Sequence, residues 1–354
     1  MTTHVVDGAN GFVASHLIGT LLARGDRVIA LARAPAAAVR RQVGAALACF
    51  GLDETLASRL PVHPLDLLEP DLGGLPVAEV FGQTCVYWHS AALVTFNPGR
   101  DTEMVPVNVA GTANALATFE RQAPPGSRYV ALSTAYQCGL DTEAVAEDWS
   151  ESAPPDRFHN FYEYTKREAE LTLVPSRSVR DGNVAVARLG VIVGHSRTGQ
   201  ALTDYGLYDF LRVIAFYARR RPGERVRIPC HPDANLHLMP IDVTIARLLS
   251  LATRALDNPI FHLVGGGSVA VGDLFAAINE RLPVELVAAT AAELARTPFT
   301  RFEAAVNLQV KYTATYLRQH YDFEVRDPAQ RPAVTPVVLG NLISWYVREG
   351  FPAS

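Results

Sequence analysis

The chain has 354 residues, of which 49% are hydrophobic and 19% are charged, and its formal net charge is −4. This length and composition are those of a globular protein with a sizeable core, built as one large α/β domain or as a dinucleotide domain that carries a smaller lobe. The small negative charge gives no sign of a broad nucleic-acid surface or of polybasic membrane binding, so neither nucleic acid nor membrane is expected as a partner.

The four cysteines are scattered and contain no Cys-x-x-Cys pair, so the sequence predicts neither a disulfide framework nor a metal site. The first residues lead directly into an apolar strand pattern, which leaves no room for a signal peptide. The sequence has no run of about 18 apolar residues that would span a membrane. We therefore expect a cytoplasmic protein without a bound metal.

The first half of the chain alternates short apolar runs with helical patterns, as the βαβ units of a parallel sheet do. Strands are expected at residues 4–7, 27–33, 61–65, 84–89, 127–133 and 184–193. Helices are expected between them at residues 12–24, 36–50, 101–122 and 161–173. Because right-handed crossovers place helices on both faces of a sheet, this order predicts an α/β fold with a doubly wound parallel sheet, the Rossmann arrangement, over residues 1–195.

Beyond residue 195, glycine and proline become frequent and the strand patterns lie farther apart. Strands are expected at residues 225–228, 260–264 and 283–286. Helices are expected at residues 202–219, 242–255, 271–281, 288–296 and over much of 308–348. We interpret residues 196–354 mostly as a smaller, mixed α/β lobe that binds the substrate, with residues 240–265 packing back onto the dinucleotide-binding core.

A glycine-rich turn joins the first strand to the first helix and has the sequence GANGFVA over residues 8–14. Glycine lets the backbone turn tightly and approach a pyrophosphate, which then lies at the helix N-terminus. Two glycines in a loop are a weak signal alone, but these two lie between a strand and an amphipathic helix, as dinucleotide binding requires. The predicted cofactor contacts in the turn are Gly8, Asn10, Gly11, Phe12 and Val13.

The end of the second strand decides between NAD and NADP, because a carboxylate there would bind the ribose 2′-hydroxyl. This strand ends in Arg33, and Asp26 precedes it. Arg33 can bind a 2′-phosphate with two hydrogen bonds, with Arg40 or Arg41 as helpers, so we predict NADP as the cofactor. The Asp7 carboxylate would repel a pyrophosphate unless the side chain turns away, and we expect it to bind loop amides.

The helix expected at residues 161–173 carries the candidate proton donor. Asn160 is a suitable N-cap, and Tyr162 and Lys166 are four residues apart and so share one face. A phenol has an unperturbed pKa of about 10, and a neighbouring ammonium would lower the Tyr162 pKa towards the working range. We predict that Tyr162 delivers the proton that accompanies hydride transfer, the alternative being an ordinary surface pair.

The segment Leu132-Ser133-Thr134-Ala135 ends a central strand, at the sheet edge where open α/β proteins bind their ligands. Side chains alternate along a strand, so only one of Ser133 and Thr134 can face the ligand. We choose Thr134, whose hydroxyl could hydrogen-bond a substrate carbonyl oxygen and polarise it.

Together, the turn at Gly8 and the side chains of Thr134, Tyr162 and Lys166 resemble the extended short-chain dehydrogenase/reductases. Four further segments resemble the branch that contains thioester reductase domains and fatty acyl reductases of the male-sterility type. These segments are LARA (31–34), HSAALVTF (89–96), NVAGT (108–112) and RLGVIVGHSRTG (188–199). The resemblance covers about residues 3–265. The chain departs from the family pattern at Asp7, Ala14 and His195, and none of the three replaces a catalytic group.

The resemblance implies a longer cofactor-binding surface. Its further members are Asp66 and Leu67 at the adenine, His89, Ala91 and Ala92 along the pyrophosphate and nicotinamide ribose, and Leu189, Gly190 and Val191 beside the nicotinamide. Lys166 would hold the ribose hydroxyls and lower the Tyr162 pKa, and Thr134 and Tyr162 would bind the substrate oxygen.

We therefore predict an NADPH-dependent oxidoreductase that reduces a carbonyl. The substrate would be a CoA- or carrier-bound acyl thioester taken to an aldehyde or alcohol, or the derived aldehyde or ketone. An acyl carrier protein would act in trans, and the protein would be a monomer or homodimer. Alternatives in the same fold are a sugar-nucleotide epimerase or dehydratase, which commonly retains NAD, and a hydroxysteroid-type alcohol dehydrogenase. A non-catalytic dinucleotide sensor would typically lack the tyrosine or the lysine.

Overall fold

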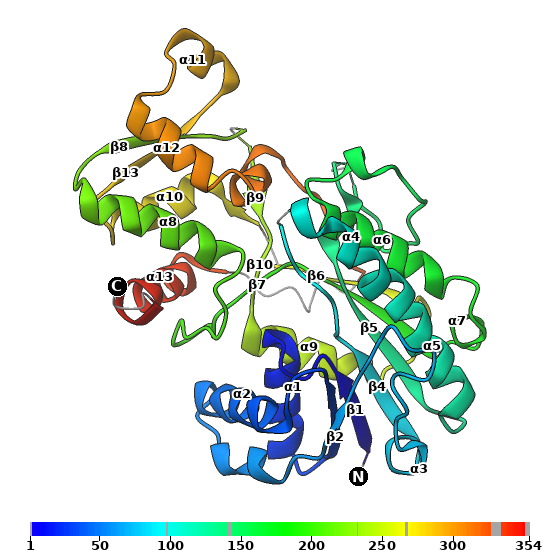
Figure 1. Ribbon diagram of the computed structural model, residues 1–354. Coiled ribbons are helices and arrows are strands. Elements are labelled where there is room, and N and C mark those ends of the chain that lie inside the picture. Colours follow the sequence, from blue (N-terminus) through cyan, green and yellow to red (C-terminus); the bar gives the residue numbers. More distant parts are fainter. Residues whose placement is uncertain are drawn as a thin grey trace. The chain divides into compact units, whose positions relative to one another are not determined.

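A computed structural model describes residues 2–96, 98–140, 144–231, 233–265, 268–326 and 334–350. The chain divides into two compact units (Figure 1). The first unit comprises Met1–Leu140, Glu147–Leu189 and Ile245–Leu263, and the second comprises Asp141–Ala146, Gly190–Thr244 and Val264–Ser354. Over the described ranges, no helix combines the length and the apolar character that a membrane span needs.

The first unit is built on a parallel sheet with the strand order β11-β6-β5-β4-β1-β2-β3. The strands are β1 (Thr3–Asp7), β2 (Arg27–Ala32), β3 (Val62–Pro64), β4 (Cys85–His89), β5 (Arg128–Thr134), β6 (Val184–Leu189) and β11 (Ile260–Leu263). The chain order reverses at β1, as it does in dinucleotide-binding sheets. The predicted doubly wound α/β fold is confirmed.

Helices connect these strands. They are α1 (Phe12–Ala23), α2 (Ala36–Cys49), α3 (Val77–Val80), α4 (Asp101–Met104), α5 (Gly111–Gln122), α6 (Phe161–Leu173) and α7 (Arg177–Arg180). A π-helical stretch, Val105–Ala110, joins α4 to α5, so the helix predicted at residues 101–122 is continuous. Figure 1 shows α1 and α2 on one side of the sheet and α5 and α6 on the other, as right-handed crossovers require.

Short 3₁₀ turns complete the path of the chain, at Glu54–Arg59, Pro98–Arg100, Ala135–Cys138, Pro155–Arg157 and Thr313–Arg318. Helix α9 (Ile241–Leu251) begins in the second unit and ends in the first. The core of the first unit is made of apolar and aromatic side chains from the strands and helices, among them Val5, Ile29, Tyr87, Tyr129 and Val186.

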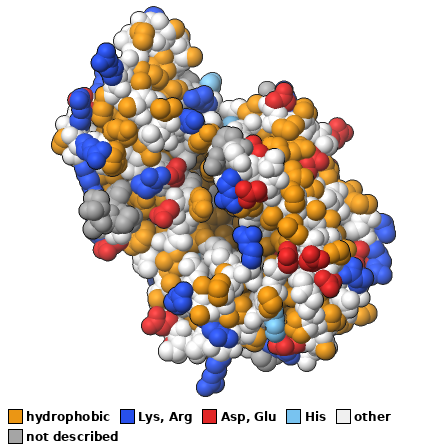
Figure 2. Space-filling model, in the orientation of Figure 1, with side chains coloured by type: hydrophobic (Ala, Val, Ile, Leu, Met, Phe, Trp, Pro, Cys, Tyr) orange, Lys and Arg blue, Asp and Glu red, His pale blue; other side chains and the backbone are white. Residues whose placement is uncertain are grey.

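The second unit consists of helices and short strand pairs around a core of its own. The pairs are β7 (Val191–Val193) with β10 (Leu238–Pro240), β9 (Asn235–Leu236) with β12 (Val269–Ala270), and β8 (Arg225–Pro229) with β13 (Glu285–Ala289). The helices are α8 (Leu207–Arg220), α10 (Val271–Asn279), α11 (Ala291–Arg296), α12 (Arg301–Gln309) and α13 (Pro336–Trp345), which continues as a π-helical turn, Tyr346–Gly350. Basic and acidic side chains are interspersed on the face shown in Figure 2.

The structure corrects several predicted boundaries. The strand predicted at residues 184–193 is two strands, because β6 pairs with β5 whereas β7 pairs with β10. Gly190 separates them, and a Cβ there would lie 2.5 Å from the His237 carbonyl oxygen, so this close approach requires glycine. The helix predicted at residues 288–296 begins only after Thr290, which caps α11, because Glu285–Ala289 pairs with β8.

Two other predicted helices are also too long. The helix expected at residues 202–219 begins at Leu207, after Gly206 with its positive φ of 65°. The pattern over residues 308–348 is split between the end of α12, a 3₁₀ turn and α13. Residues 327–333, which fell within that prediction, lie outside the described residues.

Candidate active site

The glycine turn leads from β1 into α1 with a geometry that requires glycine at residue 8. Gly8 has φ +62°, and a Cβ on it would lie 2.7 Å from the backbone nitrogen and Cα of Ala91. A 2.8 Å hydrogen bond from the Gly11 amide to the Gly8 carbonyl closes the turn. Within residues 2–96, all of them described, no side chain caps α1 and no acidic residue occupies its first turn. This helix end therefore presents backbone N–H groups to an anion.

Asp7 ends β1 next to this turn and is fully buried. One carboxylate oxygen accepts the amides of Ser90 and Ala91 at 2.6 and 2.7 Å. The other accepts the Tyr87 hydroxyl at 3.0 Å and lies 2.6 Å from Nδ1 of His89. The prediction that Asp7 binds loop amides is confirmed. Because Ala91 also touches Gly8, the Asp7 carboxylate fixes the backbone against which the phosphate turn packs.

His89 lies in the interior instead of presenting its ring to the surface. Its Nε2 is 2.9 Å from the Thr112 hydroxyl, so both ring nitrogens have protein partners. The ring keeps no polar atom for a bound molecule. The predicted lining of the cofactor path by His89, Ala91 and Ala92 stays a prediction, in which the His89 ring has both nitrogens already bound within the protein.

The arginines predicted to choose the cofactor are in different situations. Arg33 is exposed directly after β2, and its charge is near enough to Glu103 to help lower the pKa of that carboxyl. Arg40 directs Nε and Nη2 to the Leu60 carbonyl, both at 3.0 Å. Arg41 is exposed on α2. Of the two suggested helpers, Arg41 is therefore available to a ligand, whereas the Arg40 guanidinium is bound to a backbone carbonyl.

The residues predicted at the adenine follow β3. Asp66 is exposed, and its carboxylate accepts the Leu68 amide at 2.9 Å, which shapes the turn. Leu67 is buried, and its carbonyl accepts Nδ2 of Asn114 at 2.9 Å. Its side chain packs against Gly111, where a Cβ would lie 2.9 Å from the leucine Cβ. Both residues lie where the carboxyl ends of the parallel strands meet.

Helix α6 carries the candidate proton donor. The Asn160 side chain accepts the Glu163 amide at 3.0 Å, as predicted for the N-cap. Lys166 is buried and donates from Nζ to the Leu132 carbonyl of β5 at 2.8 Å. Burial lowers the pKa of Lys166 to about 8, and the carboxylates of Glu170 and Asp7 oppose that shift.

The pKa of Tyr162 is raised, chiefly because the phenol is desolvated and further because of the charge on Glu163. The expected fall of the Tyr162 pKa towards the working range is therefore wrong for this structure. Lys166 does not reverse this shift, and its Nζ is bound to a strand carbonyl.

Ser133 and Thr134 have opposite surroundings at the end of β5. Ser133 is buried and donates to Oε1 of Glu170 at 2.5 Å. Thr134 is partly exposed, accepts the Tyr136 amide at 3.2 Å and donates weakly to the Leu189 carbonyl at 3.4 Å. The first unit therefore holds the three predicted catalytic residues on two packed elements, the end of β5 and the first turns of α6.

Leu189, Gly190 and Val191 complete the predicted cofactor-binding residues. Leu189 ends β6 in the first unit, and Gly190 and Val191 follow in the second, where the Val191 amide donates to the His237 carbonyl at 2.9 Å. Among the described residues, no group of three or more histidine, cysteine or acidic side chains could hold a metal ion.

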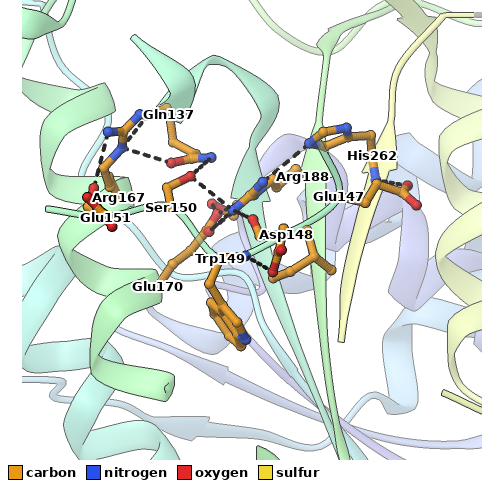
Figure 3. Close-up of polar contacts among 12 residues, drawn as sticks. Gln137, Glu147, Asp148, Trp149, Ser150, Glu151, Arg167, Glu170, Arg188 and His262 are labelled. Atoms are coloured by element: carbon orange, nitrogen blue, oxygen red, sulfur yellow. Dashed lines mark hydrogen bonds and ion pairs between the residues drawn. The ribbon is translucent and has the colours of Figure 1, made fainter. Parts of the chain in front are cut away.

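A buried polar network that the sequence did not predict lies beside the end of β5 (Figure 3). At its centre, Nη2 of Arg188 on β6 lies 2.8 Å from Oε2 of Glu170 on α6. Arg188 also donates to the Asp148 carbonyl at 2.9 Å and lies 3.3 Å from Nε2 of His262. An arginine within the apolar run Val184–Leu189 was the available signal, because a buried guanidinium needs a partner.

Known sequences similar to this chain include a protein family and a curated relative. The sequence model described as male sterility protein matches residues 6–248. Peramine synthetase A of Epichloe festucae (strain Fl1) is 32% identical over 218 residues, which are 58% of this chain and 8% of that protein. The chain thus spans less than a tenth of the length of this curated relative.

Solved structures share the fold. The terminal R domain from the myxalamid PKS-NRPS biosynthetic pathway superposes with a TM-score of 0.77 at 22% identity, covering 100% of this chain and 92% of that one. A thiolation-reductase di-domain from an archaeal non-ribosomal peptide synthetase superposes with a TM-score of 0.73 at 16% identity, covering 98% of this chain and 75% of that one.

Proposed function

The chain belongs to the male sterility protein family, and from this membership we propose that it is an NADPH-dependent reductase of carrier- or CoA-bound acyl thioesters. The observation that carries the proposal is the placement of Tyr162 and Lys166 on one helix packed against the strand end that bears Thr134. The similarity to peramine synthetase A and the fold shared with a thiolation-reductase di-domain support a thioester substrate presented by a carrier protein.

The residues present fit a nicotinamide dinucleotide. The tight turn at Gly8 and the uncapped N-terminus of α1 suit a pyrophosphate. The exposed guanidinium of Arg33, with Arg41 near it in the chain, suits a 2′-phosphate, which is why we propose NADPH and not NADH. When bound, NADPH supplies the hydride.

The protein's own part of the reaction is to bind and protonate the substrate oxygen. Tyr162 and Thr134 hold the carbonyl oxygen, and Tyr162 gives it a proton as the acyl carbon takes the hydride. The resulting hemithioacetal loses the thiol, so the C–S bond breaks and an aldehyde forms. Because the pKa of Tyr162 is raised, the phenol stays protonated at neutral pH, as a donor must be. The Lys166 ammonium stabilises the phenolate that remains until solvent returns the proton.

The test is NADPH consumption with four substrate classes: acyl-carrier and acyl-CoA thioesters, aldehydes and ketones. We expect thioesters to be reduced. Each thioester molecule should release one thiol when it consumes its first equivalent of NADPH. Consumption with aldehydes or ketones alone would contradict the thioester assignment. No consumption with any class, in protein shown to bind NADPH, would contradict the reductase assignment.

A further inference from the structure

The two residues that precede Thr134 in β5 are both bound by side chains of α6. Lys166 donates to the Leu132 carbonyl at 2.8 Å, and Ser133 donates to Oε1 of Glu170 at 2.5 Å. Lys166 and Glu170 are four residues apart, so they lie one turn apart on the same face of the helix. Two consecutive strand residues are thus attached to two consecutive turns of one helix.

The turn that follows Thr134 is attached to the same helix. Arg167 donates from Nε to the carbonyl oxygen of Gln137 at 2.8 Å and to its side-chain oxygen at 3.1 Å. The side-chain amide of Gln137 donates to the Ser150 hydroxyl at 3.1 Å, and Arg167 donates to the Glu151 carbonyl at 3.2 Å (Figure 3). The chain is therefore held on both sides of Thr134.

Arg188 holds the Glu170 carboxylate in the place where Ser133 can reach it. Arg188 is the register partner of Ser133, so the two side chains leave neighbouring strands on the same face of the sheet. The guanidinium donates to both carboxylate oxygens at 2.8 to 3.2 Å. The Arg188 and Glu170 side chains are 0% and 5% exposed, and leaving either charge unpaired there would be costly.

We propose that Glu170 and Arg167 are positioning residues, which fix the strand end that bears Thr134 to the helix that bears Tyr162. The inference rests on the proposed function, in which these two hydroxyls bind one substrate oxygen. Groups on separate elements can share one oxygen only while the elements keep a fixed separation, and a misplacement of about 1 Å can cost about 100-fold in rate. We call the contacts of Lys166, Arg167 and Glu170 with Leu132, Gln137 and Ser133 the α6 clamp.

The variant that opens the α6 clamp most gently is Ser133→Ala, which leaves the Glu170–Arg188 pair intact. Its matched control is Ser152→Ala, because the exposed Ser152 donates to Glu168 of the same helix at 2.7 Å. We expect Ser133→Ala to lower kcat for thioester reduction by about tenfold, with the Kd for NADPH changed less than about twofold. Ser152→Ala should leave both unchanged.

Hydrogen–deuterium exchange of the full chain tests the α6 clamp without any substrate. In Ser133→Ala, amides at residues 134–138 should exchange about tenfold faster than in the wild type, and in Ser152→Ala they should not. Unchanged exchange in Ser133→Ala would overturn the clamp. Faster exchange with an unchanged kcat would overturn the positioning role. A wild-type protein that reduces no thioester would instead contradict the proposed function, whatever the exchange shows.

Discussion

Two buried carboxylates of the first unit are held in different ways. Asp7, at the end of β1, is bound by the amides of Ser90 and Ala91 and by ring side chains of β4. Glu170, on α6, is bound by the guanidinium of Arg188 and by a serine hydroxyl. Asp7 therefore shapes a stretch of backbone, whereas Glu170 fixes side chains and balances a charge.

This difference divides the proposed site into two halves. The cofactor half, at the ends of β1, β2 and β4, depends on backbone shape, as the contact between Gly8 and Ala91 shows. The reaction half, at the end of β5 and on α6, depends on side chains: Thr134, Tyr162 and Lys166. Substitutions of Thr134 or Tyr162 in the reaction half should lower kcat and spare NADPH binding, and substitutions in the cofactor half should weaken NADPH binding. Lys166 belongs to both halves, because it is also predicted to hold the ribose hydroxyls.

The largest effect is expected in the reaction half, for Tyr162→Phe. Removing the proton donor should lower kcat by about 10²- to 10⁴-fold, because general acid catalysis contributes about that much. The Kd for NADPH, measured by fluorescence titration, should stay unchanged. Tyr164→Phe is the matched control, since Tyr164 packs on Phe158 from another face of the same helix. Weaker NADPH binding in Tyr162→Phe would contradict the division into halves.

The next effect is expected in the cofactor half, for Gly8→Ala. The new Cβ would meet the backbone of Ala91 at 2.7 Å in a conformation with φ +62°. Strain of this kind amounts to about 1–3 kcal/mol, so the Kd for NADPH should rise by about 5- to 150-fold. Gly25→Ala is the control, because Gly25 has φ +78° but nothing within 4 Å of its Cβ position. Equal Kd values for the two variants would show that the turn at Gly8 does not bind the cofactor.

The sequence predicts most of the parallel sheet, because strands such as β1 and β2 are compact apolar runs that a helical period follows. It does not show where β6 ends, since Val184–Leu189 and Val191–Val193 differ in their partners and not in their composition. The two-residue strands β9 and β12 are missed for the same reason. Strands so short have no periodicity of their own, and only the pairing defines them.

Within the candidate site, local features were predictable and long-range contacts were not. The Asn160 cap follows from chemistry close to a helix end. That Asp7 binds amides was predictable beside the phosphate turn, but that the amides belong to Ser90 and Ala91, 83 and 84 residues away, was not. The Glu170–Arg188 pair depends on the register of β5 with β6 and on the packing of α6, which no short motif encodes. The raised pKa of Tyr162 likewise depends on burial, which spacing along a helix does not reveal.

A smaller effect is expected for Arg33→Asp, which tests the choice of cofactor within the cofactor half. Exchanging the exposed guanidinium for a carboxylate should lower the preference for NADPH over NADH by about tenfold or more, because a charge-assisted contact is lost and a repulsion is gained. The ratio of kcat/KM for the two cofactors measures this. Arg59→Asp makes the same charge reversal just before β3, where that strand begins, and should leave the ratio unchanged. An unchanged ratio in Arg33→Asp would mean that Arg33 does not bind the 2′-phosphate.

The smallest expected effect is a shift in the pH dependence of kcat/KM. It involves both halves of the site, because Asp7 and Glu170 both raise the pKa of Lys166. With that pKa at about 8, kcat/KM should fall as the pH rises through 8, since Lys166 loses the proton that stabilises the Tyr162 phenolate. Glu170→Gln should move this limb to lower pH by about one unit, and Glu168→Gln, on the same helix, should not.

The stability of the protein should respond to the same proton with the opposite sign. An unfolded lysine holds its proton up to a pH of about 10, so above pH 8 the unfolded chain binds more protons at Lys166 than the native protein does. The contribution of Lys166 to the free energy of unfolding therefore rises between those pH values while activity falls. Urea titrations at pH 8 and 9.5, compared with those of Lys166→Met, isolate this contribution. If activity and the Lys166 contribution to stability fell together, the alkaline loss of activity would come from unfolding and not from the deprotonation of Lys166.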